Sequence, residues 1–206
     1  MERERRRERE FNENQLEGRN AVLEVLRSGR DIEKVFVQKG NVEGTIKRIV
    51  AQAAEKGVLI QETSRQKLDE MSQTKNHQGV IALVSAHDYV EVEDILNIAR
   101  AKDEDPFIIL LDGITDPHNL GAILRTAECA GAHGVIIPKR RSVGLTATVA
   151  KASAGAVEYM KVARVTNINN AIAELKEKGV WVFGTAAEGS IPMYKADLTG
   201  PAAIVI

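Results

Sequence analysis

The sequence predicts an α/β protein built from two successive domains, and three observations support this fold class. Short apolar runs alternate with longer segments in which apolar residues recur every three or four positions. An acidic stretch without strong periodicity, residues 86–105, separates two such alternating regions. The second region opens with Phe107–Leu111, an unbroken apolar run typical of buried strands in parallel sheets.

Residues 1–14 are rich in Glu and Arg, and we expect a frayed helix or a disordered arm there. Residues 15–85 form the first alternating region, which has the size of a small α/β domain. The elements expected in it are a helix at 18–29, a strand at 35–37, a helix at 42–56, a strand at 58–60, a helix at 65–71 and a strand at 80–84.

Residues 86–105 are expected to be an extended, movable linker with one short helix at 92–101. The second domain is expected at residues 106–206. The elements expected in it are a strand at 107–111, a helix at 119–130, a strand at 135–137, a helix at 146–154, a strand at 160–162, a helix at 168–178 and strands at 180–184 and 202–206.

The composition is that of a globular protein without an overall charge field. Of the 206 residues, 44% are hydrophobic and 28% are charged, and the formal net charge is −1. Any nucleic-acid binding must therefore rely on local basic patches. Aromatic residues make up only 4%, which argues against an aromatic platform for stacked bases.

The single cysteine, Cys129, excludes an internal disulfide and a cysteine-rich zinc site, and we expect no metal. We expect this cysteine to be a small buried residue of a helix. No apolar run reaches the length of a membrane span, and the charged N-terminus lacks an apolar signal region. These features predict a cytoplasmic protein without membrane association.

The segment after the apolar run at 107–111 is the most informative part of the chain. Asp112-Gly113 and Asp116-Pro117 break the apolar pattern, and a helical pattern follows. The pattern is therefore a strand, a polar loop and a helix. Open α/β sheets bind ligands at loops of this kind, which follow the carboxyl ends of the strands. Asn119 lies at the mouth of the helix and Arg125 further along it. From spacing alone, Asn119 could equally be a helix cap and Arg125 a solvated residue.

Generic motifs do not identify the chemistry, because this loop has one glycine and lacks the glycine-rich pattern of Rossmann-type methyltransferases. The segments Asp116–Gly121, Arg125–Ala127 and Ala130-Gly131 instead resemble the first signature motif of the SpoU (TrmH-like) RNA ribose 2′-O-methyltransferases. Within this family, the sequence most resembles the branch that methylates a guanosine of 23S rRNA. That branch carries an N-terminal RNA-binding domain.

The resemblance implies an S-adenosylmethionine-dependent enzyme with Asn119 and Arg125 in its catalytic centre. A ribose 2′-hydroxyl must lose its proton before it attacks a methyl group, and the adjacent phosphate must be oriented. The family's arginine is proposed as a base or as a phosphate clamp. We favour the clamp, because a guanidinium stays protonated and grips phosphate with two hydrogen bonds. Asn119 would orient Arg125 or the ribose, and Thr185 and Ala186 would contact the cofactor.

Two further segments, Gly18–Val22 and His77–Val80, are similar to the ends of the family's substrate-binding domain, a fold that resembles ribosomal protein L30e. This comparison suggests that several residues of the domain contact RNA. Each of them could instead be ordinary solvated surface, and His77 could also form a capping hydrogen bond at the turn before the strand. A basic loop after the strand at 135–137 also suits phosphate contact. The residues expected to bind RNA are Arg19, Arg65, Lys75, His77, Lys139, Arg140 and Arg141.

The resemblance also leads us to expect a methyltransferase domain that is incomplete at its C-terminus. In relatives, a Gly-x-Glu-x-x-Gly segment and a later Ser-Leu-Asn-Val-Ser-like segment supply most of the cofactor pocket, the SPOUT-type trefoil knot and much of the homodimer surface. Neither segment occurs in these 206 residues. We therefore expect a knot only in a complete chain. Two alternatives remain, a tRNA or other-site rRNA enzyme of the same family and an RNA-binding module without activity.

Overall fold

The computed structural model describes residues 14–40 and 44–206, which divide into two compact units with the boundary between Ser85 and Ala86. The predicted arm at 1–14 lies, except for Asn14, outside the described residues. The predicted start of a helix at Val42 also lies outside them.

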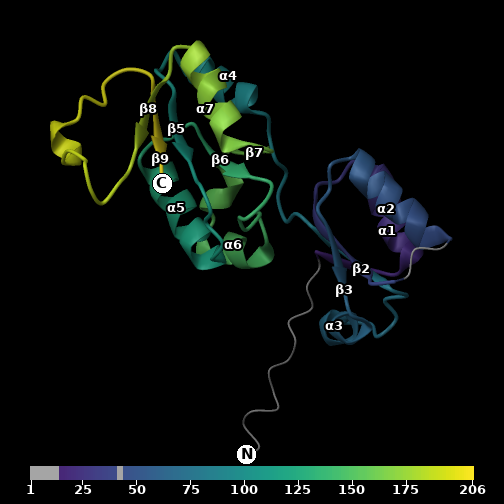
Figure 1. The fold of residues 1–206 in the computed structure, drawn as a ribbon. Helices are drawn as coiled ribbons and strands as arrows, with labels where there is room; N and C mark the ends of the chain where they lie inside the picture. The colour runs from purple at the N-terminus through teal and green to yellow at the C-terminus, as the bar shows by residue number, and fades with distance from the viewer. Residues whose placement is uncertain (1–13, 41–43) are drawn as a thin grey trace, which may run out of the picture. The chain divides into compact units, whose positions relative to one another are not determined.

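The first unit is a four-stranded sheet with helices α1 and α2 packed on one face (Figure 1). Its strand order is β1-β4-β2-β3, with β4 antiparallel to β1 and β2, and with β2 parallel to β3. The elements are β1 (Gln15–Glu17), α1 (Arg19–Ser28), β2 (Ile32–Gln38), α2 (Thr45–Glu55), β3 (Ile60–Thr63), α3 (Arg65–Met71) and β4 (Val80–Val84).

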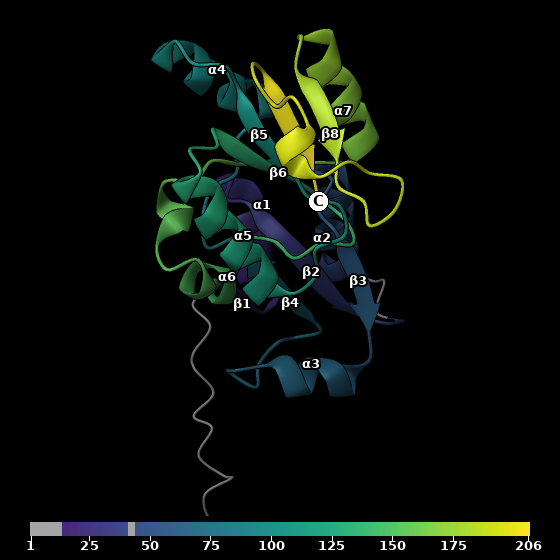
Figure 2. The ribbon, with the colours of Figure 1, turned by 90° about the vertical axis from the view of Figure 1, so that its left-hand side faces the viewer.

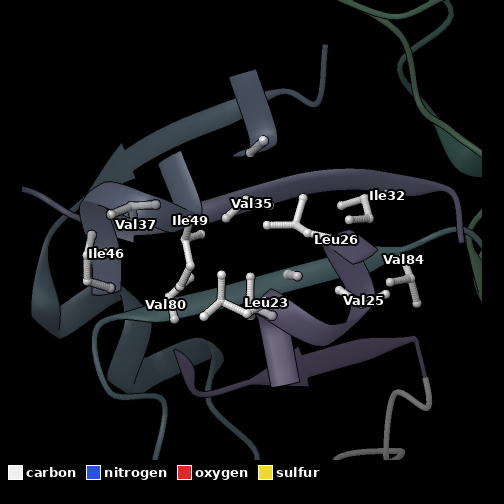
Figure 3. Close-up of a cluster of buried hydrophobic side chains, with 13 residues drawn as sticks. Leu23, Val25, Leu26, Ile32, Val35, Val37, Ile46, Ile49, Val80 and Val84 are labelled. Atoms are coloured by element: carbon white, nitrogen blue, oxygen red, sulfur yellow. The ribbon is translucent and has the colours of Figure 1, made fainter. Parts of the chain in front are cut away.

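The core of this unit forms between the sheet and the apolar faces of the two helices (Figure 3). Val35 and Val37 point inward from β2 because they are two residues apart on a strand. Leu26 of α1 and Ile46 and Ile49 of α2 lie against them and are almost fully buried. Burial of one such side chain contributes roughly 1.5–3 kcal/mol. The first unit therefore has a hydrophobic core of its own.

The second unit is a five-stranded parallel sheet of order β7-β6-β5-β9-β8 with helices on both faces (Figures 1 and 2). Two separate apolar clusters lie on its two faces, one formed with α5 and α6 and one with α4 and α7. The helices and strands are α4 (Val92–Lys102), β5 (Phe107–Leu110), α5 (Pro117–Cys129), β6 (Gly134–Pro138), α6 (Ala147–Ala152), β7 (Val162–Val165), α7 (Ile168–Glu177), β8 (Trp181–Gly184) and β9 (Ala202–Val205), with short 3-10 turns η1 (Ala156–Glu158) and η2 (Met193–Lys195).

The unbroken apolar run at β5 follows from burial on both faces. Ile109 belongs to the cluster under α5 and α6, whereas Ile108 and Leu110 belong to the cluster under α4 and α7. Successive side chains of a strand point to opposite faces, so a strand covered on both sides must be apolar at every position. The predicted parallel α/β architecture is confirmed here.

The segment 86–105, which we expected to be a movable linker, packs in the structure as part of the second unit. Ile95, Leu96 and Ala99 of α4 are buried against the sheet. The Tyr89 hydroxyl accepts a hydrogen bond from the Leu145 N–H at 2.8 Å. The prediction gave weight to the acidic residues and overlooked the apolar stripe, which recurs at helical spacing.

Several other expectations differ from the structure. β1 was not predicted, because its pairing with β4 rather than its own pattern makes it a strand. The strands expected at 58–60 and 160–162 begin two residues later, at Ile60 and Val162. Cys129 is exposed rather than buried. The buried stripe of α5 passes through Leu120 and Leu124, and residue 129 lies roughly 140–180° around the helix from them.

Helices α5 and α6 approach closely at Gly121. A Cβ atom built at this glycine would lie 2.5 Å from the Ala152 Cβ and 2.8 Å from the Ser153 nitrogen. Real Cβ atoms do not approach other atoms this closely, so the absence of a side chain at 121 permits the packing.

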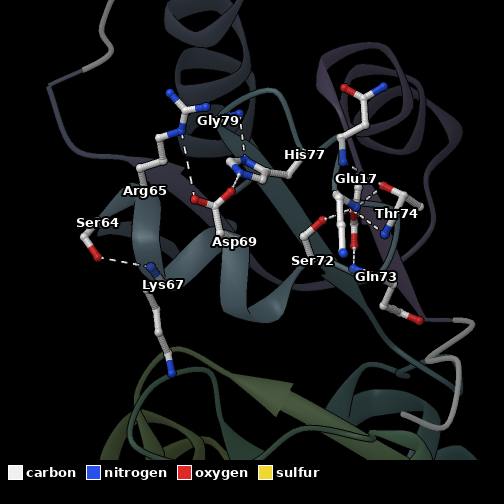
Figure 4. Close-up of polar contacts among 12 residues, drawn as sticks. Glu17, Ser64, Arg65, Lys67, Asp69, Ser72, Gln73, Thr74, His77 and Gly79 are labelled. Carbon is white, nitrogen blue, oxygen red and sulfur yellow. Dashed lines mark hydrogen bonds and ion pairs between the residues drawn. The ribbon is translucent and has the colours of Figure 1, made fainter. Parts of the chain in front are cut away.

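Glu17 is the main polar anchor of the first unit (Figure 4). Its carboxylate accepts hydrogen bonds from the Gln73 N–H at 2.6 Å, the Thr74 hydroxyl at 2.5 Å, the Ser72 hydroxyl at 2.7 Å and the Gln15 amide at 2.7 Å. Burial opposes ionisation, but these hydrogen bonds outweigh it and lower the pKa of Glu17 from 4.5 to about 2. The carboxylate thereby holds the loop between α3 and β4 against β1.

Replacement of Glu17 by Gln should flatten the acid limb of the stability profile. Because the folded-state pKa lies below the unfolded value, the carboxylate stabilises the fold fully above about pH 5. This contribution is lost as the pH falls from about 4.5 towards about 2. Urea unfolding at a series of pH values should therefore show a wild-type advantage over Glu17→Gln that is constant near neutrality and shrinks in acid. A pH-independent difference would contradict the lowered pKa.

Replacement of Gly121 by Ala should destabilise the second unit despite the better helix propensity of alanine. Forcing α6 away from α5 costs about 1–3 kcal/mol, whereas the helix gains only about 1 kcal/mol. Gly184→Ala is the matched control, because nothing lies within 4 Å of a Cβ built there. Urea unfolding should show a lower midpoint for Gly121→Ala than for Gly184→Ala, and equal midpoints would contradict the close approach.

Candidate functional site

The loops that follow the strands of the second sheet open at a single edge, because all five strands run in the same direction. The loop after β5 is fixed there by two backbone hydrogen bonds. The Asp112 N–H donates to the Ile206 carbonyl beyond β9, and the Val143 N–H donates to the Ile114 carbonyl, both at 2.9 Å. The polar loop singled out in the sequence therefore lies between the end of β9 and the segment after β6.

The basic loop after β6 lies at this edge as well. The Lys139 N–H donates to the Val165 carbonyl at 2.7 Å, and the Ser142 hydroxyl donates to the Pro138 carbonyl at 2.5 Å. Arg140 and Arg141 are exposed. The structure thus places Lys139, Arg140 and Arg141 at the same sheet edge as the loop after β5.

Asn119 lies in the first turn of α5 but is not its cap. Asp116 is the N-cap: its carboxylate accepts a hydrogen bond from the His118 N–H at 2.8 Å, and Pro117 is the first helical residue. The capping alternative for Asn119 is therefore wrong. The side chain of Asn119 is exposed at the edge where the loops open.

Arg125 lies further along α5, and its side chain is also exposed. It lies six positions after Asn119, which corresponds to about 9 Å along the helix axis and about 120° around it. Within residues 14–40 and 44–206, neither side chain forms a hydrogen bond or an ion pair. The Asn119 amide therefore does not hold the Arg125 side chain in this structure.

Thr185 and Ala186, the residues expected to contact a cofactor, follow β8 and are exposed. The Thr185 hydroxyl donates to the Val205 carbonyl at 2.9 Å, and its backbone N–H donates to the same carbonyl at 3.0 Å. These residues share the carboxyl edge with the loop after β5 and are separated from it by β9. Both donors of Thr185 are therefore used within the sheet, and its hydroxyl oxygen can still accept a hydrogen bond from a ligand.

The first unit contains an open groove of about 470 Å³. The four residues of this unit that the sequence directed toward RNA all line it, although they come from α1, from α3 and from the loop before β4. They are Arg19, Arg65, Lys75 and His77, and the other lining residues are Gln38, Asp69, Asn76, Gln78 and Gly79.

His77 is a buried residue of the groove wall rather than an exposed one (Figure 4). Its Nδ1 accepts a hydrogen bond from the Gly79 N–H at 2.9 Å, and its Nε2 lies 2.9 Å from an oxygen of Asp69. The histidine therefore makes the local backbone hydrogen bond that the sequence left open as an alternative. Because only 7% of its side chain is exposed, it has little surface for RNA.

The N-terminus of α1 forms another side of the groove. Gly18 is the N-cap residue and has no side chain to cap the helix. Gln78, from the loop before β4, takes this role: the Gln78 side-chain oxygen accepts a hydrogen bond from the Arg19 N–H at 3.1 Å. The Arg19 side chain in turn donates to the Gln78 carbonyl at 3.1 Å. Gln78 adopts a left-handed backbone with φ of 51°, which residues other than glycine rarely adopt. The loop is thus held in an uncommon conformation beside the groove.

Sequence reasoning missed Asp69, the acid of this groove. A signal was present, because Asp69 lies four residues after Arg65 and residues at this spacing share a helix face. The two side chains form an ion pair at 4.0 Å, and both are largely exposed.

Residues 14–40 and 44–206 contain no group of three or more His, Cys, Asp or Glu side chains that could hold a metal ion. In the same part of the chain, no helix has the length and apolar character needed to cross a membrane.

Comparison with known proteins places these features in a family. The SpoU rRNA Methylase family matches residues 106–206, and the family described as RNA 2′-O ribose methyltransferase substrate binding matches residues 15–90. YacO of Bacillus subtilis, assigned to the TrmH family of tRNA/rRNA methyltransferases, is 48% identical over 92% of this chain and 76% of its own length. A TrmH family protein of Staphylococcus saprophyticus is 43% identical over the same shares.

Among solved structures, the SpoU methyltransferase AviRb from Streptomyces viridochromogenes, in complex with the cofactor AdoMet, superposes with a TM-score of 0.51. The match has 17% sequence identity and covers 93% of this chain and 71% of that one. At this identity the likeness shows the fold, and it agrees with the predicted SPOUT-type α/β architecture. With both halves of the chain matched by family models and a relative at 48% identity, the chain belongs to the SpoU (TrmH-like) family of RNA methyltransferases.

Proposed function

We propose that this protein catalyses the S-adenosylmethionine-dependent 2′-O-methylation of a guanosine ribose in 23S rRNA. We further propose that it acts in the cytoplasm as a homodimer. The observation that carries the proposal is the pair of exposed side chains on α5, Asn119 and Arg125, in a chain of this family. Both side chains are open to a substrate, and the basic loop after β6 lies at the same sheet edge as Asn119.

The division of labour follows from the chemistry of each group. The cofactor, when bound, supplies a methyl group on a sulfonium. Arg125 binds a phosphate next to the target ribose with its two-pronged guanidinium, and so fixes the nucleotide. Asn119 orients the 2′-hydroxyl with its amide, and Thr185 and Ala186 contact the cofactor. Orientation of this kind supplies a large part of the rate of a transfer reaction.

RNA binding is assigned to both units. Residues 15–85 act as the substrate-binding domain, in which the groove cations Arg19, Arg65 and Lys75 contact phosphates. The basic loop 139–141 contacts phosphates near the target nucleotide. The names of the relatives cover tRNA as well as rRNA. A tRNA methyltransferase is therefore the second candidate, and transfer of methyl groups to tRNA but not to 23S rRNA would select it.

Replacement of Arg125 by Ala should lower kcat for methyl transfer by about 10²- to 10³-fold, because it removes a preorganised cation at the reacting nucleotide. The affinity for RNA should fall by less than about tenfold, since other cations remain. The measurement is transfer of labelled methyl groups to unmethylated 23S rRNA by the full-length protein, together with RNA binding by filter retention.

Arg100→Ala is the matched control, because it removes an exposed arginine from α4, which packs on the opposite face of the sheet. It should leave kcat unchanged. Unchanged activity in Arg125→Ala would refute the catalytic role of this residue. If the wild-type protein binds RNA but transfers no methyl group to 23S rRNA or tRNA, an RNA-binding module without activity is the correct description.

Replacement of both Arg140 and Arg141 by Ala should weaken RNA binding in a salt-dependent manner. Each lost phosphate contact reduces the slope of log K against log salt concentration by about 0.7–0.9. Affinity titrations at several salt concentrations should therefore give a slope that is shallower by about 1.4–1.8 for the double variant. If the double variant lowers the affinity by the same factor at every salt concentration, so that the slope is unchanged, neither arginine contacts a phosphate.

A further inference from the structure

The groove of the first unit combines three cations with one acid. Arg19, Arg65 and Lys75 supply the positive charge, and Asp69 is the acid that lines the same space. The Asp69 side chain is 57% exposed, so its carboxylate is accessible to a ligand. A carboxylate repels phosphate, so its presence in a groove that binds only RNA backbone requires an explanation.

The orientation of this carboxylate is fixed by His77. Because the Gly79 N–H donates to Nδ1 of His77, that nitrogen carries no proton in this arrangement. The ring proton is therefore on Nε2 and is donated to the Asp69 oxygen 2.9 Å away. The histidine is buried and cannot turn freely, so the Asp69 carboxylate is held between His77 and Arg65 (Figure 4), three residues that line the groove.

The ion pair with Arg65 does not explain why an acidic side chain lines this cationic groove. The Asp69 oxygen lies 4.0 Å from the Arg65 nitrogen, and the two side chains are 57% and 76% exposed. An exposed ion pair at this distance contributes little to stability. Each carboxylate oxygen also has more than one acceptor position, so both oxygens of Asp69 remain able to accept hydrogen bonds from a ligand.

We propose that Asp69 reads the Watson–Crick edge of one unstacked guanine in the RNA, with Arg19 and Lys75 on the flanking phosphates. Guanine presents two adjacent N–H donors, N1–H and the 2-amino group, which match the two oxygens of a carboxylate. Single-stranded RNA is read through base edges in this manner. This inference rests on the proposed function, since it names what the RNA-binding groove recognises.

The dimensions and lining of the groove support this assignment. Its volume of about 470 Å³ lies in the range of sites that enclose small organic ligands. No Phe, Tyr or Trp lines it, and the one imidazole, that of His77, has only 7% of its side chain exposed, so recognition of a base there depends on hydrogen bonds rather than on stacking on an aromatic ring. The amide side chains of Gln38, Asn76 and Gln78 lie around the same space and offer further donors and acceptors.

The test is binding of short single-stranded RNAs to the 206-residue chain by fluorescence anisotropy. The probes share one sequence and carry guanosine, inosine, adenosine or uridine at a single central position. The wild-type chain should prefer guanosine to adenosine and uridine by about tenfold, as expected for a bidentate contact. Inosine, which lacks the 2-amino group, should bind with intermediate affinity.

The variant is Asp69→Asn, which can still accept the hydrogen bond from His77 but offers one acceptor in place of two. It should lose most of the preference for guanosine, including the difference between guanosine and inosine. Glu70→Gln is the matched control, because it removes the neighbouring acid of α3, which pairs with Lys67 and does not line the groove. It should keep the wild-type preference.

Two outcomes would overturn the proposal. If Asp69→Asn binds all four RNAs more tightly by the same factor, the acid only repels phosphate. If it binds all four more weakly by the same factor, the acid only positions Arg65. In both cases RNA binding by the first unit stands and base reading fails. Absence of RNA binding by the wild-type chain would instead remove the RNA-binding role proposed for the first unit, and base reading with it.

Discussion

The parallel pairing of β9 between β5 and β8 is the constraint on which the second unit depends. It joins β5 to a strand that lies almost one hundred residues further along the chain, and that strand pairs in turn with β8. Through it, the loop after β5 and the segment after β8 open at one edge. The hydrogen bonds from Asp112 to Ile206 and from Thr185 to Val205 are direct products of this pairing. Asn119 and the pair Thr185 and Ala186 therefore lie at the same sheet edge through strand order, not through sequence proximity.

The elements that the sequence predicted well are those whose ends are marked by local residues. α3 and β4 have the predicted limits, because Ser64 caps the helix and Gly79 precedes the strand. β1 and the packing of α4 were missed, because partners elsewhere in the chain create them. Pairing with β4 makes Gln15–Glu17 a strand, and the sheet buries the apolar stripe of a helix whose acids had suggested a linker.

For the candidate site, local pattern and family resemblance supplied different parts. The strand, loop and helix around Asn119 followed from pattern alone, whereas roles for Asn119 and Arg125 came from the resemblance. Neither could show that Arg19, Arg65 and Lys75 line one groove, since this depends on how α1 and α3 pack around the sheet. Asp69 was within reach through helical spacing, but its orientation by His77 depends on a contact across a turn.

The anchoring of Glu17 has a consequence for the order of folding. Its partners Ser72, Gln73 and Thr74 lie 55 to 57 residues away in sequence, so their hydrogen bonds require closure of a long loop. Contacts of this separation form late, after local helices and turns. The loop that carries Lys75 thus acquires its shape only when β1 has docked on β4. A nascent chain that has completed only α1 and α2 therefore still lacks the side chains of α3 and of the loop before β4 that line the groove.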